Sequence, residues 1–324
     1  MTASARKKLN RRRVLFIGAA LAGAALAPSA LAAPEQPVAH WRGVALGADA
    51  TLQLAGVSQD DAAPVFAAIE REITRLEDIF SLYRRDSALS RLNAEGMLDA
   101  PPPELIELLG TARTAWHATD GLFDPTVQPL FSAMAGHYTA GRTDRPTLDG
   151  ALALVGFGKV QFDAGSVRFA RPGMAMTFNG IAQGYLTDRV TALLRAQGFD
   201  NVLVDLGEIR GLGPGRHGGG WRVGLARPGA NGAMPHFIDV RDRAVATSAM
   251  LGTTFDQAGS AGHILHPVHG VAAAWRKQVT VLDSSAARAD ALSTAATLMD
   301  DAQVDRLREG GAVVMAYPMQ AGTA

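Results

Sequence analysis

The sequence contains no cysteine, and this absence excludes several classes of protein. A chain without cysteine forms no disulfide bonds, has no thiolate nucleophile and cannot be a lipoprotein anchored through cysteine. Excess charge of one sign is also lacking, because 31 basic side chains balance 31 acidic ones among the 324 residues. The composition therefore offers no electrostatic attraction to nucleic acids or anionic membranes, and we expect no nucleic-acid partner.

Long, strongly apolar runs are missing as well, although an uncharged run lies near the N-terminus. It extends from Val14 to Ala33, consists mainly of alanine and glycine, and contains Pro28. The basic cluster Arg11-Arg12-Arg13 precedes it, and Ala30-Leu31-Ala32 closes it. A basic region, an apolar stretch and a small-residue cleavage site are typical of a secretory signal, and the arginines resemble a twin-arginine signal.

We therefore predict a twin-arginine signal peptide over residues 1–32, a mature domain over residues 33–324, and export to the periplasm. Retention of the same run as a membrane anchor is the alternative, but a membrane-spanning helix needs about 20 strongly apolar residues. With 48% hydrophobic residues, the mature chain can bury a substantial core as one large domain or two closely packed lobes.

Hydrophobic periodicity predicts both helices and strands in the mature chain. Helices are expected over residues 64–80 with Pro64 at the start, and from Asp86-Ser87 to Asn93. A further helix opens at the prolines 101–103 and runs through Leu105 to Trp116, and another follows Tyr185. Strands are expected over 51–57, 160–169 as a hairpin, 174–178, 201–206, 221–226, 237–248, 278–282 and 311–317, with a surface loop over 136–150. Because strands come in runs with helices grouped between them, the pattern favours an α+β fold.

Asp290 and Thr294 stand four residues apart in an alanine-rich run that favours helix. Both oxygens would then project from one helix face. A carboxylate beside a hydroxyl offers the hard oxygen ligands that Mg²⁺ accepts while it keeps waters and substrate phosphates. The alternative is structural, with Asp290 placing its charge near the positive end of the helix.

Two further stretches could contribute to a site. Asn179–Tyr185 is a glycine-containing turn between an expected strand and a helix, an arrangement that aims backbone N–H groups at an anion. His263, His266 and His269 are three residues apart, but Pro267 rules out a helix that would align them. A zinc or copper site is one interpretation, and a loop in which one histidine serves as donor or base is the other.

Seven short motifs run in the order of one known family, from about Trp41 to Ala316. They are Phe80-Ser81-Leu82-Tyr83, Asp120-Gly121-Leu122-Phe123-Asp124-Pro125-Thr126, Asn179-Gly180-Ile181-Ala182-Gln183-Gly184-Tyr185-Leu186-Thr187-Asp188, Val204-Asp205-Leu206-Gly207, Ala246-Thr247-Ser248, His263-Ile264-Leu265-His266-Pro267 and Ala289-Asp290-Ala291-Leu292-Ser293-Thr294-Ala295. Each motif alone is unspecific. Together they make the chain resemble the ApbE family, flavin transferases that move FMN from FAD onto a protein threonine or serine.

The resemblance implies a T-fold-like, two-lobed α+β protein with mainly antiparallel sheets, FAD between the lobes and Mg²⁺ on its pyrophosphate. The metal ligands it implies are Asp290, Thr294 and a backbone carbonyl near Gly180. The FAD contacts it implies are Tyr83, Leu122, Phe123, Asp124, Thr177, Gln183, Ile264 and Leu265. A base must take the proton of the acceptor hydroxyl, and His263 is the candidate.

Four positions depart from the usual family pattern. Gln183 replaces a common lysine, Glu208 replaces a second glycine, His266 replaces an aspartate and His269 replaces a threonine. An exported member of this kind resembles maturation factors that flavinylate membrane electron-transfer proteins, including those serving nitrous oxide reduction. Two other hypotheses stay open: an FAD pyrophosphatase, with water as the nucleophile, and a non-catalytic flavin-binding or carrier protein.

Overall fold

The structure is a computed structural model that describes residues 37–225, 236–271 and 277–318. The predicted signal peptide over residues 1–32 lies outside these ranges. Within them, no helix combines the length and the apolar character that crossing a membrane requires.

A seven-stranded sheet forms the centre of the molecule, and every neighbouring pair of its strands is antiparallel. In spatial order the strands are β1 (Val38–Ala45), β2 (Ala48–Ala55), β6 (Val202–Asp205), β7 (Ile209–Leu212), β10 (Arg243–Ala249), β11 (Lys277–Asp283) and β12 (Val313–Pro318). Two small antiparallel sheets complete the strands: β3 (Met97–Asp99), β5 (Ser166–Phe169) and β4 (Val160–Phe162), and β8 (Trp221–Leu225) with β9 (His236–Val240). The α+β class expected from the sequence is confirmed.

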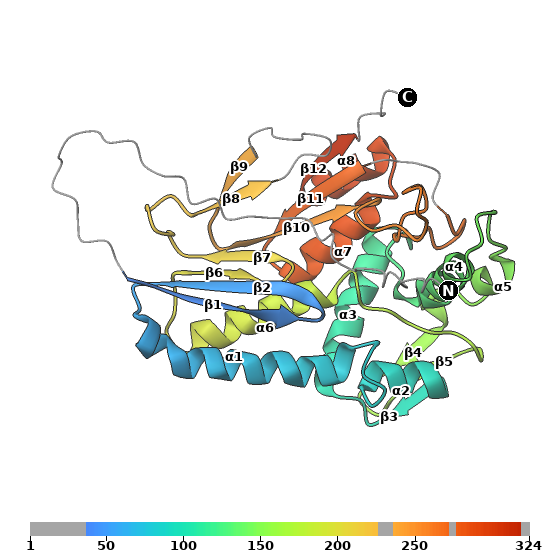
Figure 1. The fold of residues 1–324 in the computed structure, drawn as a ribbon, viewed down its shortest axis with the longest axis horizontal. Coiled ribbons are helices and arrows are strands. Elements are labelled where there is room, and N and C mark those ends of the chain that lie inside the picture. The colour runs from blue at the N-terminus through green and yellow to red at the C-terminus, as the bar shows by residue number, and fades with distance from the viewer. Residues whose placement is uncertain (1–36, 226–235, 272–276, 319–324) are drawn as a thin grey trace, which may run out of the picture.

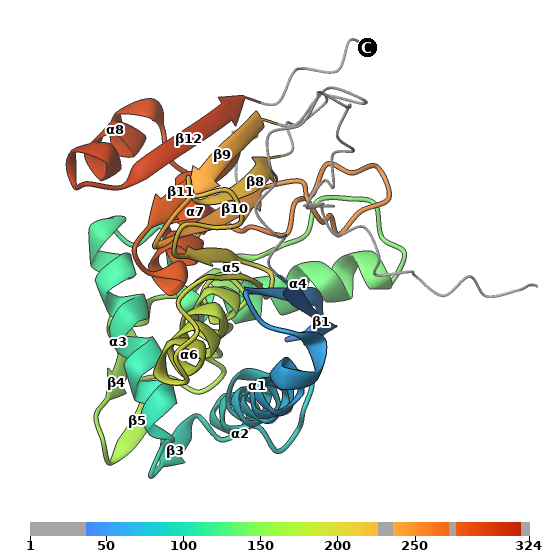
Figure 2. The same cartoon turned by 90° about the vertical axis from the view of Figure 1, so that its left-hand side faces the viewer.

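Helices cover one face of the large sheet (Figure 1). They are α1 (Gln59–Phe80), α6 (Ala182–Ala196) and α7 (Ala286–Ala296), with α3 (Pro103–Ala118) packed against α1 and α7. The β8–β9 hairpin lies over the other face (Figure 2). Successive side chains of β6 point to opposite faces of the sheet. Val202 and Val204 therefore pack in the main core on the helix side, whereas Leu203 packs in the cluster around Trp221 on the other side.

Helix α7 is enclosed on almost every side, which explains its alanine content. It packs against β10, β11, α6 and α3, and Arg288 is its exposed residue. The approach of α6 is very close, because a β-carbon on Gly184 would lie 2.3 Å from the carbonyl oxygen of Ala286. Small side chains are therefore a steric requirement of this contact.

A second cluster of buried residues lies beside the main core. Helix α4 (Gln128–Thr139), the short helix α5 (Asp149–Leu152) and the loop after β10 together bury Leu130, Met134 and Leu265. The remaining helices are α2 (Ala88–Glu95), between α1 and β3, and α8 (Asp301–Glu309), before β12.

Several expectations about single elements are wrong. Residues 174–178 form no strand. The side chain of Asn93 bonds both the N–H and the carbonyl of Met176, a role that a neighbouring strand would otherwise fill. Helix α1 begins at Gln59, where the hydroxyl of Ser58 caps the N–H of Asp61, so Pro64 lies inside it. The expected loop over 136–150 contains the end of α4 and the start of α5. Residues 237–248 divide into two strands, while β1 and α8 were not expected.

Candidate active site

Asp290 lies at the contact between α6 and α7 and is only 3% exposed. Its Oδ2 accepts a hydrogen bond of 3.1 Å from the N–H of Gly184. Gly184 belongs to the first turn of α6, where backbone N–H groups have no partner within the helix. Burial raises the pKa of Asp290 to about 7, and the hydrogen bond from Gly184 offsets part of that rise.

Two further carboxyl groups lie close to the turn between β6 and β7: Asp205 is the last residue of β6, and Glu208 directly precedes β7. Glu208 is buried, and burial, followed by the negative charges of Asp290 and Asp205, raises its pKa well above the ordinary value. Burial also raises the pKa of Asp205, to about 6. Three neighbouring carboxyl groups in a low-dielectric environment resist ionisation unless a cation balances them.

Thr294 follows Asp290 by one helical turn, as its spacing predicted, and is half-buried. A β-carbon on Gly180 would lie 2.9 Å from the Thr294 Oγ1, so the loop before α6 packs against this hydroxyl. The structure thus brings together the three positions predicted to hold a metal. Within the described ranges, no three His, Asp or Glu side chains could hold a metal by themselves. One carboxylate, one hydroxyl and one carbonyl suit Mg²⁺, which retains waters and phosphate oxygens.

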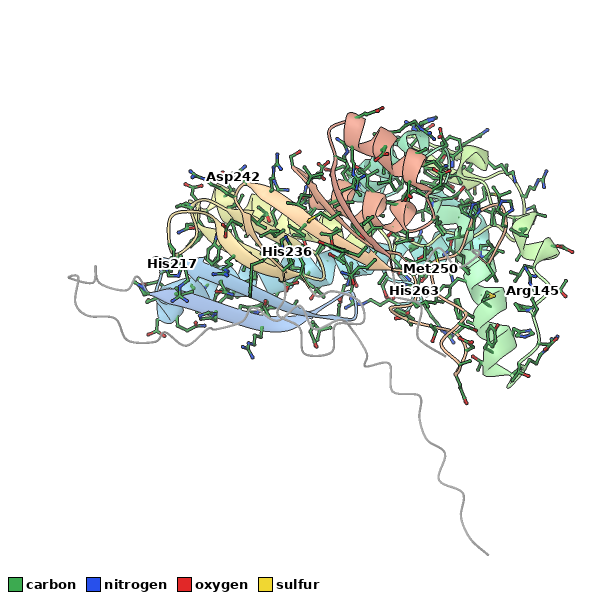
Figure 3. The ribbon with its side chains drawn as sticks, turned by 90° about the horizontal axis from the view of Figure 1, so that it is seen from above. Arg145, His217, His236, Asp242, Met250 and His263 are labelled. Atoms are coloured by element: carbon green, nitrogen blue, oxygen red, sulfur yellow. The ribbon has the colours of Figure 1, made fainter. Side chains whose placement is uncertain are left out.

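His263 lies in the loop that follows β10, next to Met250 (Figure 3). Its backbone N–H donates to the carbonyl of Thr253 at 3.1 Å, and its ring Nδ1 lies 3.0 Å from the same oxygen. A carbonyl only accepts, so Nδ1 carries the proton and Nε2 carries the lone pair. Burial lowers the pKa of His263, while the carbonyls of Thr253 and Met250 act in the opposite direction. The imidazole is therefore neutral at pH 7.

Asp256 organises the same loop. Its carboxylate accepts hydrogen bonds from the N–H and the hydroxyl of Ser260 and from the N–H of Ala261. Met250 follows Ser248 of β10 by two residues, about 7 Å along an extended chain. The Ser248 hydroxyl lies 3.3 Å from that of Thr294, so the histidine loop and the Asp290–Thr294 pair meet at one end of β10.

The other two histidines of the motif differ from His263. The rings of His266 and His269 lie against each other with centroids 4.4 Å apart, and the Nδ1 of His266 accepts hydrogen bonds from the N–H groups of Val268 and His269. Burial, followed by the charge of His269, lowers the pKa of His266. The three imidazoles do not form a metal cluster within the described part of the chain.

Asp124 is buried, and protein donors occupy its carboxylate. It accepts from the N–H and hydroxyl of Thr126, from the N–H of Phe157 and from the side chain of Trp116. Burial raises its pKa in spite of these bonds. The two residues that precede Asp124 are also shielded from solvent: Phe123 is buried and Leu122 is half-buried. Asp124 thus fixes the shape of this loop through bonds within the protein.

The remaining residues predicted to contact FAD lie on four segments. Gln183 packs against the main chain of Gly207, where a β-carbon would come within 2.5 Å of its Nε2. The Oγ1 of Thr177 accepts a bond of 3.2 Å from the N–H of Asn179, which shapes the loop before α6. Leu265 is buried and Ile264 half-buried, whereas Tyr83, between α1 and α2, is 72% exposed. These residues therefore lie on separate segments, and the contacts described here do not link the four segments to one another.

Sequence reasoning missed the polar network around α7. The carboxylate of Asp188 on α6 accepts hydrogen bonds from the Ser285 hydroxyl and from the N–H groups of Ala286 and Ala287, and it also pairs with Arg210. It therefore fixes the N-terminus of α7, which carries Asp290. The motifs that contain Asp188 and Ser248 were visible in the sequence, as was Glu208 as a departure from the family pattern, but nothing in their spacing showed that they converge.

A surface hollow of about 580 Å³ lies elsewhere, between α1, α2, β3 and the start of α3. Its charged lining consists of Arg75, Asp78, Asp86, Arg91 and Glu104, and it includes none of the predicted site residues. We place the site where α6 and α7 meet the β6–β7 turn, because the buried carboxyl groups of Asp290, Asp205 and Glu208 act on one another there.

The fold is that of the flavin transferases. The solved flavin transferase ApbE from Vibrio cholerae superposes with a TM-score of 0.75 at 26% identity, over 87% of this chain and 97% of that one. The apo form of the flavinyl transferase ApbE from Pseudomonas stutzeri gives a TM-score of 0.76 at 25% identity, over 88% and 92% of the two chains.

A sequence model of the ApbE family matches residues 46–316, and the chain belongs to this family. Relatives that bear the name FAD:protein FMN transferase include proteins from Treponema pallidum and Vibrio cholerae. The protein from Treponema pallidum is 32% identical over 266 residues, which cover 74% of this chain and 73% of the relative. The protein from Vibrio cholerae is 29% identical over 286 residues, covering 84% and 85%.

Proposed function

We propose that this protein is an FAD:protein FMN transferase, which joins FMN through a phosphoester bond to a threonine or serine of an acceptor protein and releases AMP. The observation that carries the proposal is the meeting of Asp290 and Thr294 with the Gly180–Gly184 turn, in a chain of the ApbE family. These residues form a compact oxygen site beside a helix N-terminus, the environment that a pyrophosphate requires.

We infer that the oxygen site takes Mg²⁺, held by the carboxylate of Asp290, the hydroxyl of Thr294 and the carbonyl of Gly180. The fit rests on the buried carboxyl groups. Burial raises the pKa values of Asp290 and Glu208, and the negative charges of Asp290 and Asp205 raise that of Glu208 further, so a divalent cation would favour the ionised carboxylates. When bound, Mg²⁺ would offset the charge on the pyrophosphate and on the departing AMP.

His263 supplies the base in this proposal. Its Nε2 takes the proton of the acceptor hydroxyl while the hydroxyl oxygen attacks the phosphorus of the FMN portion. A phosphorus–oxygen bond to the acceptor forms, and the bond to the AMP oxygen breaks. The Thr253 carbonyl holds Nδ1–H, so the ring presents its lone pair from a fixed position.

The site of action and the acceptor rest on the sequence alone. The arginine cluster ahead of the uncharged run supports periplasmic export by the twin-arginine route. A membrane electron-transfer protein with a threonine or serine flavinylation site is the partner that such an exported transferase would serve.

Mass spectrometry of an acceptor peptide incubated with the protein, FAD and Mg²⁺ tests the function. Transfer predicts that the mass of the peptide increases by that of FMN less one water, and that AMP is released in equal amount. Free FMN with AMP and an unchanged peptide would identify the pyrophosphatase instead. Unchanged FAD that stays bound to the protein would identify a flavin carrier. Omission of Mg²⁺ from the same reaction tests the metal separately.

A further inference from the structure

A chain of hydroxyl groups leads away from the proposed metal ligand Thr294. Its Oγ1 lies 3.3 Å from the Oγ of Ser248 on β10. The Ser248 Oγ lies 2.7 Å from the Oγ of Ser293 on α7. The Ser293 hydroxyl in turn lies 3.0 Å from the backbone carbonyl oxygen of Asp290. Ser293 is fully buried, and Ser248 and Thr294 are half-buried, so the chain runs from the protein interior to the site.

The carbonyl at the inner end fixes the direction of every bond. A carbonyl only accepts, so Ser293 must donate its single proton to Asp290. Ser293 then has only lone pairs to offer Ser248, which must donate to it. The proton of Ser248 is thereby used, and Ser248 can only accept from Thr294. The proton of Thr294 consequently points toward β10.

This direction matters to a cation, because a hydroxyl binds a metal through a lone pair and repels it through its proton. We propose that Ser248 is a positioning residue that holds the Thr294 proton on the β10 side and so presents the oxygen lone pairs of Thr294 to Mg²⁺. The inference rests on the metal site of the proposed function. Partners that orient the ligands of a metal typically change its affinity about 10–100-fold.

Titration with Mn²⁺ tests the inference without reference to turnover. Free Mn²⁺ is counted by its electron paramagnetic resonance signal in the presence of the FAD-loaded protein. Ser248→Ala removes the acceptor of the Thr294 proton and should weaken Mn²⁺ binding by about tenfold or more. Ser248→Thr retains a hydroxyl on the strand and should restore affinity to within about threefold of the unaltered protein. Ser293→Ala, which acts from α7, should produce a smaller loss because it only frees the direction of the Ser248 proton.

Thr247→Ala is the matched control, because the neighbouring Thr247 bonds the hydroxyl of Thr280 at 2.9 Å and not that of Thr294. It removes a hydroxyl pair from the same strand and should leave Mn²⁺ affinity unchanged. Equal losses in Ser248→Ala and Thr247→Ala would show a general loosening of β10 and overturn the inference. Unaltered affinity in Ser248→Ala would overturn it as well, while leaving the metal site in place. Absence of Mn²⁺ binding in the unaltered protein would overturn the metal site and this inference together.

Discussion

Asp290 combines two roles that its substitution can separate. Asn at this position retains an acceptor for the N–H of Gly184 but removes the charge that opposes Glu208. We expect Asp290→Asn to abolish Mg²⁺-dependent transfer while the melting temperature of the metal-free protein stays equal or rises. Transfer at millimolar Mg²⁺ and thermal unfolding in EDTA measure the two effects. Retention of near-normal transfer would show that the metal is held elsewhere.

The same carboxyl group gives the metal-free protein a pH-dependent stability. Burial raises its pKa to about 7 in the folded chain, whereas the ordinary aspartate value of 3.8 applies in the unfolded chain. Between these two pH values the folded form therefore binds more protons than the unfolded form. Stability must then fall as pH rises from about 4 to 7 and level off above. Thermal unfolding in EDTA between pH 5 and pH 8 should show this fall. Asp290→Asn should make this fall shallower, and the part that remains belongs to Asp205 and Glu208, whose pKa values burial also raises. Saturating Mg²⁺ should reverse the fall. A melting temperature that rises over this pH interval would contradict the expectation.

His263 should govern the pH dependence of transfer. The neutral ring is the active form, and burial lowers its pKa below the ordinary 6.5, so the rise of kcat with pH should lie below that value. His263→Asn keeps a hydrogen-bonding side chain but removes the proton acceptor, and kcat should fall about a hundredfold or more with little change in FAD affinity. Stopped transfer assays between pH 5 and 8 measure both.

His266→Asn and His269→Asn are the controls for this experiment, because their rings contact each other in a separate part of the loop. They should retain kcat within about tenfold and keep the pH-dependent step. Equal losses in all three variants would favour a shared metal site over a single base. Weaker FAD binding by His263→Asn, with little change in kcat, would mark a hydrogen-bonding role.

At the scale of elements, the contact between α6 and α7 decides the geometry of the site. Gly184→Ala would place a methyl group 2.3 Å from the carbonyl oxygen of Ala286 and so force the helices apart. Overpacking of this kind typically costs about 1–3 kcal/mol, and it should also weaken Mn²⁺ binding because the bond from Gly184 to Asp290 would lengthen. Urea unfolding and Mn²⁺ titration measure the two consequences.

Gly110 in α3 provides a matched control, since a β-carbon there has no neighbouring atom within 4 Å. Gly110→Ala should stabilise the protein by about 0.5–1 kcal/mol through the higher helix propensity of alanine, with metal affinity unchanged. If both variants unfolded at the same urea concentration as the original chain, the close packing of α6 on α7 would be wrong.

Local signals predicted the elements better than the connections between them. The periodic pattern of α1 and the alanine run of α7 were sufficient to locate both helices, and the Asp290–Thr294 spacing placed both oxygens on one face. Asn93 replaces a strand partner for Met176 through its side chain, 83 residues away in sequence, which no local pattern can show. No local pattern could show that Glu208 and Ser248 belong to the site either, because both owe their place to residues of α7 that lie far along the chain: Asp290 acts on Glu208, and Thr294 contacts Ser248.

At the scale of the whole molecule, the export signal remains a prediction about residues outside the described ranges. Replacement of Arg11, Arg12 and Arg13 together by lysine should leave the precursor in the cytoplasm, because the twin-arginine route requires the arginine pair. Fractionation of cells and N-terminal sequencing of the mature chain, expected to begin near Ala33, measure the outcome. Normal export of the lysine variant would point to the general secretory route.

The enclosure of α7 has a consequence for mutational tolerance. Of its eleven residues, Arg288 is exposed, Thr294 is half-buried and the rest are buried. A saturation screen that selects for function should therefore find almost every position between 286 and 296 intolerant, whether or not the residue takes part in chemistry. Arg288 should be the permissive exception. Intolerance in this helix consequently does not identify a ligand, and variants there become informative only when metal binding and unfolding are measured on the same purified protein.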